Sequence, residues 1–403
     1  MEIPVVSHDP SPVSRAGTHV LAITPAVRRR SLTAVMSSIL AVGMTMGITA
    51  PLLSLLIERL GHGASVSGLN ASAGAAAVAL MAPVVPRLVR RIGALGAMYV
   101  GAALTAVAIL AVPAADNVWF WFVLRFLMGV GISVHWVVGE TWLNTMATDA
   151  NRGLIAGIYS TVLGIGFAAG PMVVAAVGLD GLLPFAVSAG LLLLSALPLM
   201  MARRLAPQAA GHGGQSQLRS LLAAPTIMAA VFACGFIDLS ILSLLPVYAL
   251  RGGLSEDGAL ILLTVLISGT VAMQIPTGWL ADRFGRFRLL IVCAVVGALC
   301  PLLVPYALDI PALLWPVLFL WGGTTVSLYT LALALLGERF TGDALASANS
   351  TMVIAYCVGS IIGPAITGAA MQVLGAHAMP LVLAAVPALF AAGALTFRNG
   401  AGR

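Results

Sequence analysis

The sequence has no lysine and very few charged residues of either sign. Charged residues make up 8% of the 403 positions, whereas about a quarter of a typical soluble domain is charged. Hydrophobic residues account for 60% of the chain, so there is too little charge to cover a core with a polar surface. The scarcity of charge therefore excludes an ordinary water-soluble protein and predicts a chain whose main solvent is lipid.

Cysteine is also scarce, and its placement excludes several kinds of site. The four cysteines fall inside apolar runs, without a CxxC pair or metal-ligand spacing, and we interpret them as small buried hydrophobes. The chain has no Walker A stretch for ATP and no nucleophile or metal constellation typical of an enzyme. The sequence therefore predicts that the protein is not an enzyme and has no cofactor and no metal site.

The abundant feature is the long apolar run. A helix needs about 20 apolar residues to cross the hydrocarbon core of a membrane. Runs of this length begin near Ser31, Ser65, Ala94, Asn117, Gly153, Leu182, Leu222, Asp257, Phe287, Pro311, Ala344 and Ala378. The sequence therefore predicts an all-α integral membrane protein with twelve transmembrane helices.

Two polar segments divide the chain into domains. Residues 1–27 contain no long apolar run, and we expect a disordered cytoplasmic tail there. Residues 205–221 lie halfway along the chain and are rich in Gly, Gln, Ser and Ala, which is typical of a flexible linker. The expected domains are a six-helix bundle over 28–204, a cytoplasmic linker over 205–221 and a second six-helix bundle over 222–398.

The arginines predict an orientation. With the N-terminus inside, 17 of the 20 arginines lie in inner segments, Arg59 and Arg251 lie outside, and Arg125 lies within a span. Cytoplasmic loops of membrane proteins are enriched in basic residues. We therefore expect both termini in the cytoplasm and the chain in the cell inner membrane. We interpret the arginine clusters as signals of this orientation, and we expect no nucleic-acid partner.

The two halves of the sequence repeat. Gly93, in RRIGALG, and Gly285, in DRFGRFR, are 192 residues apart. Pro171, in GFAAGP, and Pro364, in GSIIGP, are 193 residues apart. Two unrelated motif pairs with nearly one offset indicate duplication of a six-helix unit. Bundles related in this way place a substrate site at the midplane between the halves and work by alternating access.

A charged loop separates the eighth and ninth spans. Gly278, Asp282, Arg283, Gly285 and Arg286 form the pattern G-x-x-x-D-R-x-G-R. Gly278 would let helices approach closely, Gly285 would permit a tight turn, and Asp282 could accept charge-assisted hydrogen bonds. The pattern resembles the signature loop of the major facilitator superfamily, and we interpret it as a gating loop, with plain positive-inside charge as the alternative.

The first-half copy of this loop departs from the pattern. Pro86, Arg90 and Ala94 stand where Gly, Asp and Arg are expected. An acidic latch is therefore expected in the second half alone, and the first-half loop is interpreted mainly as an orientation signal.

The fourth span carries two charges at membrane depth. Arg125, Gly129 and Gly131 match the R-x-x-x-G-x-G stretch of the same superfamily. At 100° per residue, Arg125, Trp136 and Glu140 share one helical face. Ionisable groups at this depth must face the bundle interior or water. We predict Arg125 and Glu140 as proton-coupling residues, with a structural hydrogen bond and an anchor for the inner loop as their respective alternatives.

Asp238 is the other acid at membrane depth, near the middle of the seventh span, with no basic residue within two turns on its own helix. A carboxyl in apolar surroundings could load and release a proton near neutral pH, and a hydrogen bond to a neighbouring helix is the alternative. We predict Asp238 as the proton carrier in a substrate cavity lined also by Arg125, Trp136 and Trp321. Pairing of Asp238 with Arg125 in one conformation alone would couple the proton to the transport cycle.

Small residues recur near the outer ends of the fifth and eleventh spans. The pattern G-x-x-x-G-P is formed by Gly166, Gly170 and Pro171 and again by Gly359, Gly363 and Pro364. Small residues allow close helix contact, and proline gives a bend that a hinge could use. These residues are predicted to serve packing or a hinge, and tight packing alone explains them equally well.

The resemblance to the major facilitator superfamily covers residues 31–397, and VVGETWL, NRGLIAGIYS and RRIG resemble its YcaD-like branch. Relatives of that branch include copper importers and riboflavin transporters, but the M-x-x-x-M and H-x-x-x-M pairs that the copper importers carry in spans seven and eight are absent from those spans here. The resemblance implies a secondary active, proton-coupled transporter of a small organic solute, working by import or drug-like efflux. A copper or other metal importer is the alternative, and a non-transporting membrane sensor is a remote one. The expected partners are the solute, protons and the lipid bilayer, and a monomer is expected.

Overall fold

The computed structural model describes residues 25–146, 152–201, 224–340 and 342–400. Its first helix begins at Pro25, so the predicted tail ends earlier than residue 27. The rest of that tail, and the predicted linker over 205–221, lie outside the described residues.

The described chain is nearly all helical, as the apolar runs predict. In chain order the elements are α1 (Pro25–Arg59), α2 (Ala64–Met81), α3 (Val85–Leu110), the 3-10 helix η1 (Val112–Ala114), α4 (Val118–Met146), α5 (Arg152–Val177), α6 (Leu183–Leu194), α7 (Ala196–Met201), α9 (Pro225–Arg251), α10 (Glu256–Ala272), α11 (Gln274–Phe284), α12 (Arg286–Ala307), α13 (Pro311–Arg339), α14 (Gly342–Leu374) and α15 (Ala378–Gly400). Eleven spans in the described part are long and apolar enough to cross a membrane. The pair α10 and α11, bent by 44°, forms a twelfth candidate span, which agrees with the predicted number.

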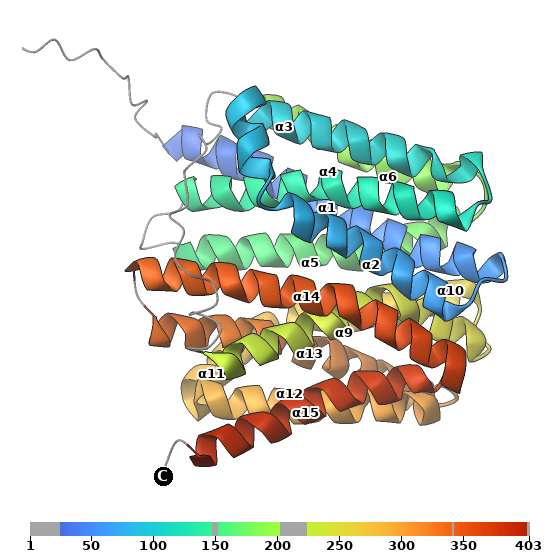
Figure 1. Ribbon diagram of the computed structural model, residues 1–403, viewed down its shortest axis with the longest axis vertical. Coiled ribbons are helices and arrows are strands. Elements are labelled where there is room, and N and C mark those ends of the chain that lie inside the picture. The colour runs from blue at the N-terminus through green and yellow to red at the C-terminus, as the bar shows by residue number, and fades with distance from the viewer. Residues whose placement is uncertain (1–24, 147–151, 202–223, 341, 401–403) are drawn as a thin grey trace, which may run out of the picture.

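The helices form two bundles, with α1–α7 in the upper half of Figure 1 and α9–α15 in the lower half. The internal repeat is visible in the element boundaries: α1 and α9 end at residues 192 apart, and α2 and α10 begin 192 apart. Gly93 interrupts α3 with a φ of 78°, and Gly285 separates α11 from α12 with a φ of 86°. Both are left-handed conformations that glycine adopts without strain. The third span therefore starts with a separate helical segment from Val85, earlier than the apolar run indicates.

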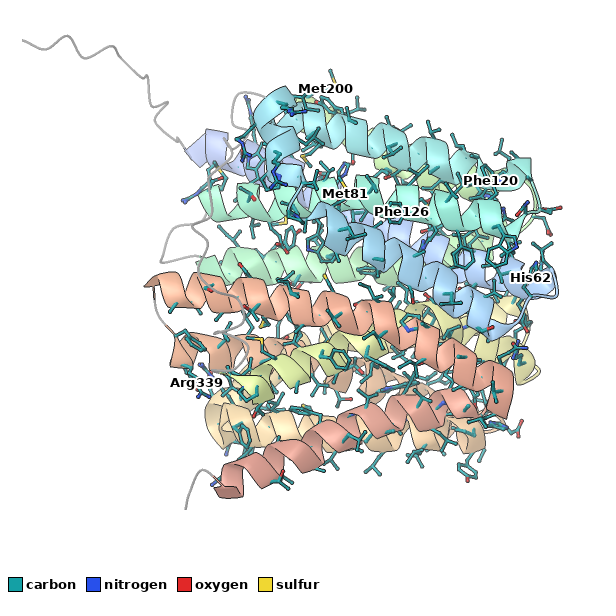
Figure 2. The ribbon with its side chains drawn as sticks, viewed as in Figure 1. His62, Met81, Phe120, Phe126, Met200 and Arg339 are labelled. Carbon is teal, nitrogen blue, oxygen red and sulfur yellow. The ribbon has the colours of Figure 1, made fainter. Side chains whose placement is uncertain are left out.

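The helices run between two ends of the molecule that differ in charge. We call the end that carries Arg90, Arg286 and Arg339 the Arg-rich end, and the end that carries Arg59 and Arg251 the salt-bridged end. Figure 2 marks them with Arg339 and His62, which lie at opposite ends of the bundle. Between the ends, large apolar side chains such as Phe120 and Phe126 on α4 are exposed on the outer surface. This surface suits contact with lipid.

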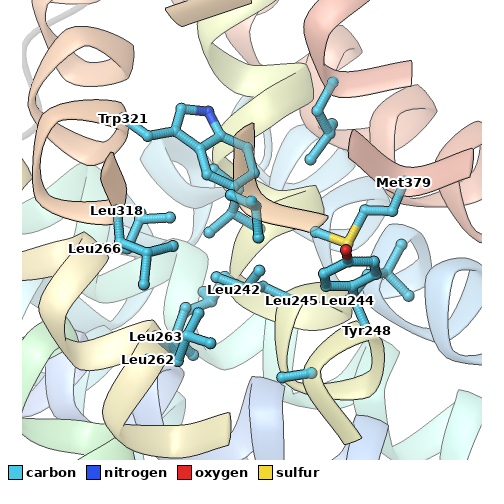
Figure 3. Packing of buried hydrophobic residues seen from close by; sticks show 14 of the residues in the cluster. Leu242, Leu244, Leu245, Tyr248, Leu262, Leu263, Leu266, Leu318, Trp321 and Met379 are labelled. Atoms are coloured by element: carbon cyan, nitrogen blue, oxygen red, sulfur yellow. The ribbon is translucent and has the colours of Figure 1, made fainter. Parts of the chain in front are cut away.

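The hydrophobic core is continuous between the halves at one end and divided at the other. At the salt-bridged end, the cluster built on α9, α10 and α13 includes Ala50 of α1 and Ala64 of α2, and the cluster around α1 and α4 includes Leu260 of α10. Figure 3 shows part of the first cluster. At the Arg-rich end, each of the two remaining clusters contains residues of one half alone. The halves are therefore packed together at the salt-bridged end and hold separate cores at the Arg-rich end.

Candidate functional site

Asp238 lies at the middle of α9, on a helix otherwise enclosed by protein. Every other residue from Ala233 to Ala249 is buried, whereas the Asp238 side chain is exposed. Its carboxylate accepts a hydrogen bond of 2.7 Å from the hydroxyl of Tyr356 on α14. Because the helix is surrounded by its neighbours, the accessible surface at Asp238 belongs to the interior of the helical bundle and not to its outer surface.

Glu140 approaches the same region from the other half. Its carboxylate accepts a hydrogen bond of 2.9 Å from the indole of Trp136, one turn earlier on α4. The carboxylate is also within electrostatic reach of Tyr159 on α5, and of Tyr329 and Cys357 on α13 and α14 of the second half. Glu140 therefore faces the interface between the two bundles.

The aromatic side chains connect the two acids. Tyr329 and Tyr356 contact each other edge to face, with ring centroids 5.8 Å apart. Tyr356 donates to Asp238, and Tyr329 lies within reach of Glu140. We call the set of Trp136, Glu140, Tyr159, Asp238, Tyr329 and Tyr356 the acidic–aromatic cluster. The three tyrosines were not predicted from the sequence, because an aromatic residue inside an apolar run usually packs in a core.

Arg125 occupies a different place from the two acids. Its side chain is 5% exposed, inside the first half, and one guanidinium nitrogen donates to the Thr49 hydroxyl of α1 at 3.1 Å. Its Nε has no hydrogen-bond partner. Arg125 and Asp238 are therefore not paired in this conformation.

Trp321 is also buried, at 1% exposure, in the cluster that Figure 3 shows. Its ring packs among leucines such as Leu318 and Leu266, so it does not line a cavity in this conformation. Of the predicted cavity residues, Trp136 and Asp238 are accessible at the interface of the halves, whereas Arg125 and Trp321 are enclosed.

The charged loop between α11 and α12 makes its ionic and hydrogen-bond contacts with other residues of the second half. Arg286 bonds Glu338 at 3.0 Å and the Ala334 carbonyl at 3.2 Å, both near the end of α13. Asp282 lies 3.8 Å from the same guanidinium and is 77% exposed, so its ion pair is weak in this conformation. The Arg283 guanidinium lies over the Trp279 ring, 5.6 Å from its centroid.

The two glycines of this loop have different roles. Gly285 supplies the left-handed turn that the sequence predicted. A Cβ at Gly278 would meet nothing within 4 Å. The expected close helix contact at Gly278 is therefore wrong for this conformation, because no neighbouring helix reaches that exposed position.

The repeated G-x-x-x-G-P motifs lie where helices cross closely. Gly166 and Gly170 of α5 face Gly43 and Gly47 of α1, and a Cβ at Gly166 would lie 2.6 Å from the Leu40 carbonyl oxygen. Gly359 and Gly363 of α14 face the backbone of α9 at Phe232 and Phe236. Pro171 and Pro364 lie inside the continuous helices α5 and α14. The pairs α1–α5 and α9–α14 are equivalent in the two halves.

Gly170→Val is expected to destabilise the folded protein, because the new side chain would meet the α1 backbone at Gly47. Overpacking of this kind costs about 1–3 kcal/mol or more. The measurement is the midpoint of thermal unfolding of the purified protein in detergent. Gly190→Val on α6 is the matched control, since no atom lies within 4 Å of its Cβ position. Equal midpoints for the two variants would contradict close packing at Gly170.

The salt-bridged end carries an ion-pair network that the sequence analysis did not predict. Arg59, at the end of α1, forms two bonds of 2.5 Å with Glu256 of α10 and one of 2.7 Å with Asp180. Arg251, at the end of α9, forms bonds of 2.6 and 3.0 Å with Glu58 of α1. Each arginine therefore forms a bidentate ion pair with a carboxylate of the opposite half, and bidentate geometry makes such pairs stronger than single contacts.

The positions of two arginines in the sequence could have indicated this ion-pair network. Arg59 and Arg251 are the two arginines predicted on the outer side, and they are 192 residues apart, the offset of the repeat. Their cross-half partners, Glu256 and Glu58, lie on helices of the opposite half, and the sequence alone does not show which helices meet there.

Among the described residues, no group of three or more His, Cys, Asp or Glu side chains is placed to hold a metal ion. The copper interpretation therefore gains no support from this part of the chain.

A pocket of about 650 Å³ lies at the Arg-rich end, between α1 and α5, with Arg28 and Arg29 in its wall.

Comparisons with known proteins agree with this architecture. Residues 35–328 and 253–401 match the model of the Major Facilitator Superfamily. The chain is 29% identical over 336 residues to the "Uncharacterized MFS-type transporter YfkF" of Bacillus subtilis (strain 168), covering 82% of this chain and 86% of the relative. It is 30% identical over 308 residues to the MFS-type transporter YcaD of Escherichia coli O9:H4 (strain HS), covering 75% and 79%.

Two solved structures share the fold. A mutant of the nucleoside transporter NupG superposes with a TM-score of 0.75 at 13% identity, covering 91% of this chain and 99% of its own. A bacterial homologue of the human lysosomal transporter Spinster superposes with a TM-score of 0.73 at 14% identity, covering 93% and 96%. The sequence matches and the shared fold lead to one assignment. The chain belongs to the major facilitator superfamily of membrane transporters.

Proposed function

We propose that this protein is a secondary active transporter that moves a small organic solute by alternating access, driven by a proton gradient. The observation that carries the proposal is the asymmetry of the interface between the halves. The cores are joined and bridged by ion pairs at the salt-bridged end, and separate at the Arg-rich end. Such a molecule is closed on one side of the membrane and releases or receives solute on the other.

Contacts between the two halves support an interface that is closed at the salt-bridged end. At the outer half of the interface, the Ser72 hydroxyl of α2 donates to the Ile361 carbonyl of α14 at 2.6 Å. Gly68 and Gly368 bring the backbones of these two helices together. Toward the Arg-rich end, Asp238 and the partly exposed side chains of Trp136, Glu140 and Tyr356 lie on the same interface. The acids are thus accessible on the side where the halves hold separate cores.

Asp238 and Glu140 are the reason for proposing the proton as the coupling ion. An ionisable group at membrane depth is tolerated when it is neutralised, paired or hydrated. In the described part of the chain neither Asp238 nor Glu140 forms an ion pair, and each accepts one hydrogen bond from an aromatic donor. A carboxylate without a fixed cation can bind a proton on one side of the membrane and release it on the other. We assign Asp238 as the proton carrier and Glu140 as a second coupling residue.

The proposed orientation places the Arg-rich end in the cytoplasm, so this structure is the inward-facing state. The structural neighbour related to Spinster is itself inward-facing and unoccupied. The Arg286 loop and the arginines of α1 would then lie against the cytoplasmic face, and both termini would be cytoplasmic, in the bacterial inner membrane.

Single introduced cysteines test this orientation. In a protein whose four native cysteines are replaced, Asp309→Cys at the salt-bridged end should react with a membrane-impermeant thiol reagent added outside intact cells. Gly213→Cys, in the predicted cytoplasmic linker, should react after the membrane is opened and not before. Labelling of the second variant in intact cells would reverse the orientation.

Transport itself is tested with the purified protein in proteoliposomes. A panel of small solutes of different charge is offered with and without a pH gradient. The proposal predicts accumulation of at least one solute, and loss of that accumulation when the gradient is collapsed. Accumulation that depends on a sodium gradient instead, or does not depend on any ion gradient, would contradict proton coupling.

A further inference from the structure

The acidic–aromatic cluster has two negative groups and no positive one among the described residues. Glu140 comes from the first half and Asp238 from the second. The groups around the two acids are the indole of Trp136, the hydroxyls of Tyr159, Tyr329 and Tyr356, and the thiols of Cys234 and Cys357. None of these groups carries positive charge, so the site has an unbalanced negative charge whenever both acids are ionised.

The positively charged side chains lie elsewhere. Arg125 is enclosed in the first half and bonded to Thr49. Arg28 and Arg29 line the pocket at the Arg-rich end of α1, where the Arg28 Nε donates to the Met146 carbonyl at 2.8 Å. His135, on the same helix as Glu140, is 2% exposed and directed at the Gly131 carbonyl. An anionic solute would therefore meet two carboxylates at this site without a cation to bind it.

The aromatic rings favour the opposite charge. The faces of Trp and Tyr rings carry negative electrostatic potential and attract cations within about 6 Å of the ring centre. Rings here come from α4, α5, α13 and α14, so both halves contribute. The contact between Tyr329 and Tyr356 is edge to face, at an interplanar angle of 83°. The two carboxylates accept hydrogen bonds from polar atoms at the edges of two of these rings, so acids and aromatic groups lie together, as a site for a cation with an apolar periphery requires.

We propose, building on the transport function above, that the acidic–aromatic cluster is the substrate site and that the substrate is an organic cation with an apolar or aromatic body. The carboxylates of Glu140 and Asp238 neutralise its charge, and the rings of Trp136, Tyr329 and Tyr356 contact its body. The cation and the proton compete for the same two carboxylates. Binding of one releases the other, so the transporter exchanges an organic cation for protons.

The test is equilibrium binding of tetraphenylphosphonium to the full-length protein in lipid nanodiscs, with empty nanodiscs subtracted. Tetraphenylborate is the matched probe, because it has the same shape and the opposite charge. At pH 8 the cation should bind at least about tenfold more tightly than the anion, since a charge-assisted interaction contributes about 1.5–3 kcal/mol. Lowering the pH to 5 should weaken cation binding to the unmodified protein.

Variants locate the binding site. Glu140→Gln and Asp238→Asn should each weaken tetraphenylphosphonium binding by about tenfold, the loss expected for one charge-assisted contact. Asp257→Asn, an exposed acid at the salt-bridged end, is the control and should leave binding unchanged. Weaker binding in both acid variants, with an unchanged control, supports the site. The measurement at two pH values needs no variant, so a misfolded variant does not decide the result.

Three results would overturn the cation assignment: equal binding of the two probes, binding that does not depend on pH, or binding unaffected by both acid variants. Accumulation of a neutral or anionic solute in proteoliposomes, without tetraphenylphosphonium binding, would overturn the cation assignment and leave proton-driven transport standing. Binding of the cation at this site without transport of any solute would support the site and contradict the proposed function.

Discussion

Asp238→Asn is expected to abolish accumulation of solute driven by a pH gradient, whereas exchange of solute across the membrane should continue when the solute is at a saturating concentration. Asn has nearly the shape of a protonated Asp but cannot ionise, so the variant is fixed in the proton-loaded form. Asn can still accept the hydrogen bond of Tyr356, which preserves the 2.7 Å contact with α14. At saturating solute, where weaker binding no longer limits exchange, the remaining loss should be the loss of proton release.

The measurement compares two assays on the same proteoliposomes, namely accumulation under a pH gradient and exchange of labelled for unlabelled solute at equal pH. Asp282→Asn is the control, because that acid lies in the gating loop and is largely exposed. It should slow both assays and leave their ratio unchanged. If the Asp238→Asn variant still accumulates solute against its gradient, Asp238 is not the carrier, and Glu140 becomes the candidate.

Removal of both arginines at the salt-bridged end is expected to open that end of the protein. Arg59 and Arg251 each form two bonds with a carboxylate of the opposite half. Partly exposed ion pairs contribute about 0–1 kcal/mol each. Loss of both therefore weakens closure by up to about 2 kcal/mol, which changes the ratio of closed to open molecules by a factor of up to about 30.

Cys357 is a native reporter of this opening. It lies within electrostatic reach of Glu140 across the interface between the halves. In a protein with the other three cysteines replaced, a membrane-impermeant reagent added outside should label Cys357 slowly. The Arg59→Ala, Arg251→Ala double variant should be labelled several-fold faster, and Asp309→Ala, at the same end without a salt bridge, should not.

A charge reversal separates the ion pair from general destabilisation. Arg251→Glu alone places two acids together at Glu58 and should increase labelling of Cys357. Arg251→Glu combined with Glu58→Arg restores an opposite-charge pair and should return labelling toward the original rate. If labelling stays fast in the combined variant, the arginine acts through packing and not as an ionic gate.

The sequence was sufficient for the architecture because lipid imposes a simple rule. Every span needs about 20 apolar residues, so the apolar runs reveal the helices almost directly. The run near Asn117 corresponds to α4 from Val118, and the run near Phe287 corresponds to α12 from Arg286. The start of α3 was misplaced because Val85 begins a helical segment with arginines on it, which hydropathy does not recognise as part of a span.

The site was harder to predict because it depends on which face of each helix meets the interface. Helical periodicity placed Arg125, Trp136 and Glu140 on one face of α4, but in this state Arg125 is enclosed while Trp136 and Glu140 are partly exposed. Trp321 was assigned to the cavity on residue type, yet it fills the core beside Leu318. A large aromatic residue in an apolar run fits either environment, so the three-dimensional packing decides between them.

The conformation was not accessible from the sequence either. The salt bridges of Arg59 and Arg251 join the two halves, so they depend on how the halves are arranged. The proposed alternating access requires two arrangements of the halves, and the internal repeat does not say which contacts belong to each. The ionic network at one end and the divided core at the other supply that information for one state.

The most direct test of alternating access is the distance across both ends of the interface in the same protein, measured by double electron–electron resonance between paired spin labels. One pair, Leu60→Cys with Asp257→Cys, spans the salt-bridged end, and the other, Arg87→Cys with Gly337→Cys, spans the Arg-rich end; all four positions are exposed. As pH or solute is changed, the account predicts that the first distance lengthens while the second shortens. Distances that stay constant, or that change in the same direction at both ends, would contradict it.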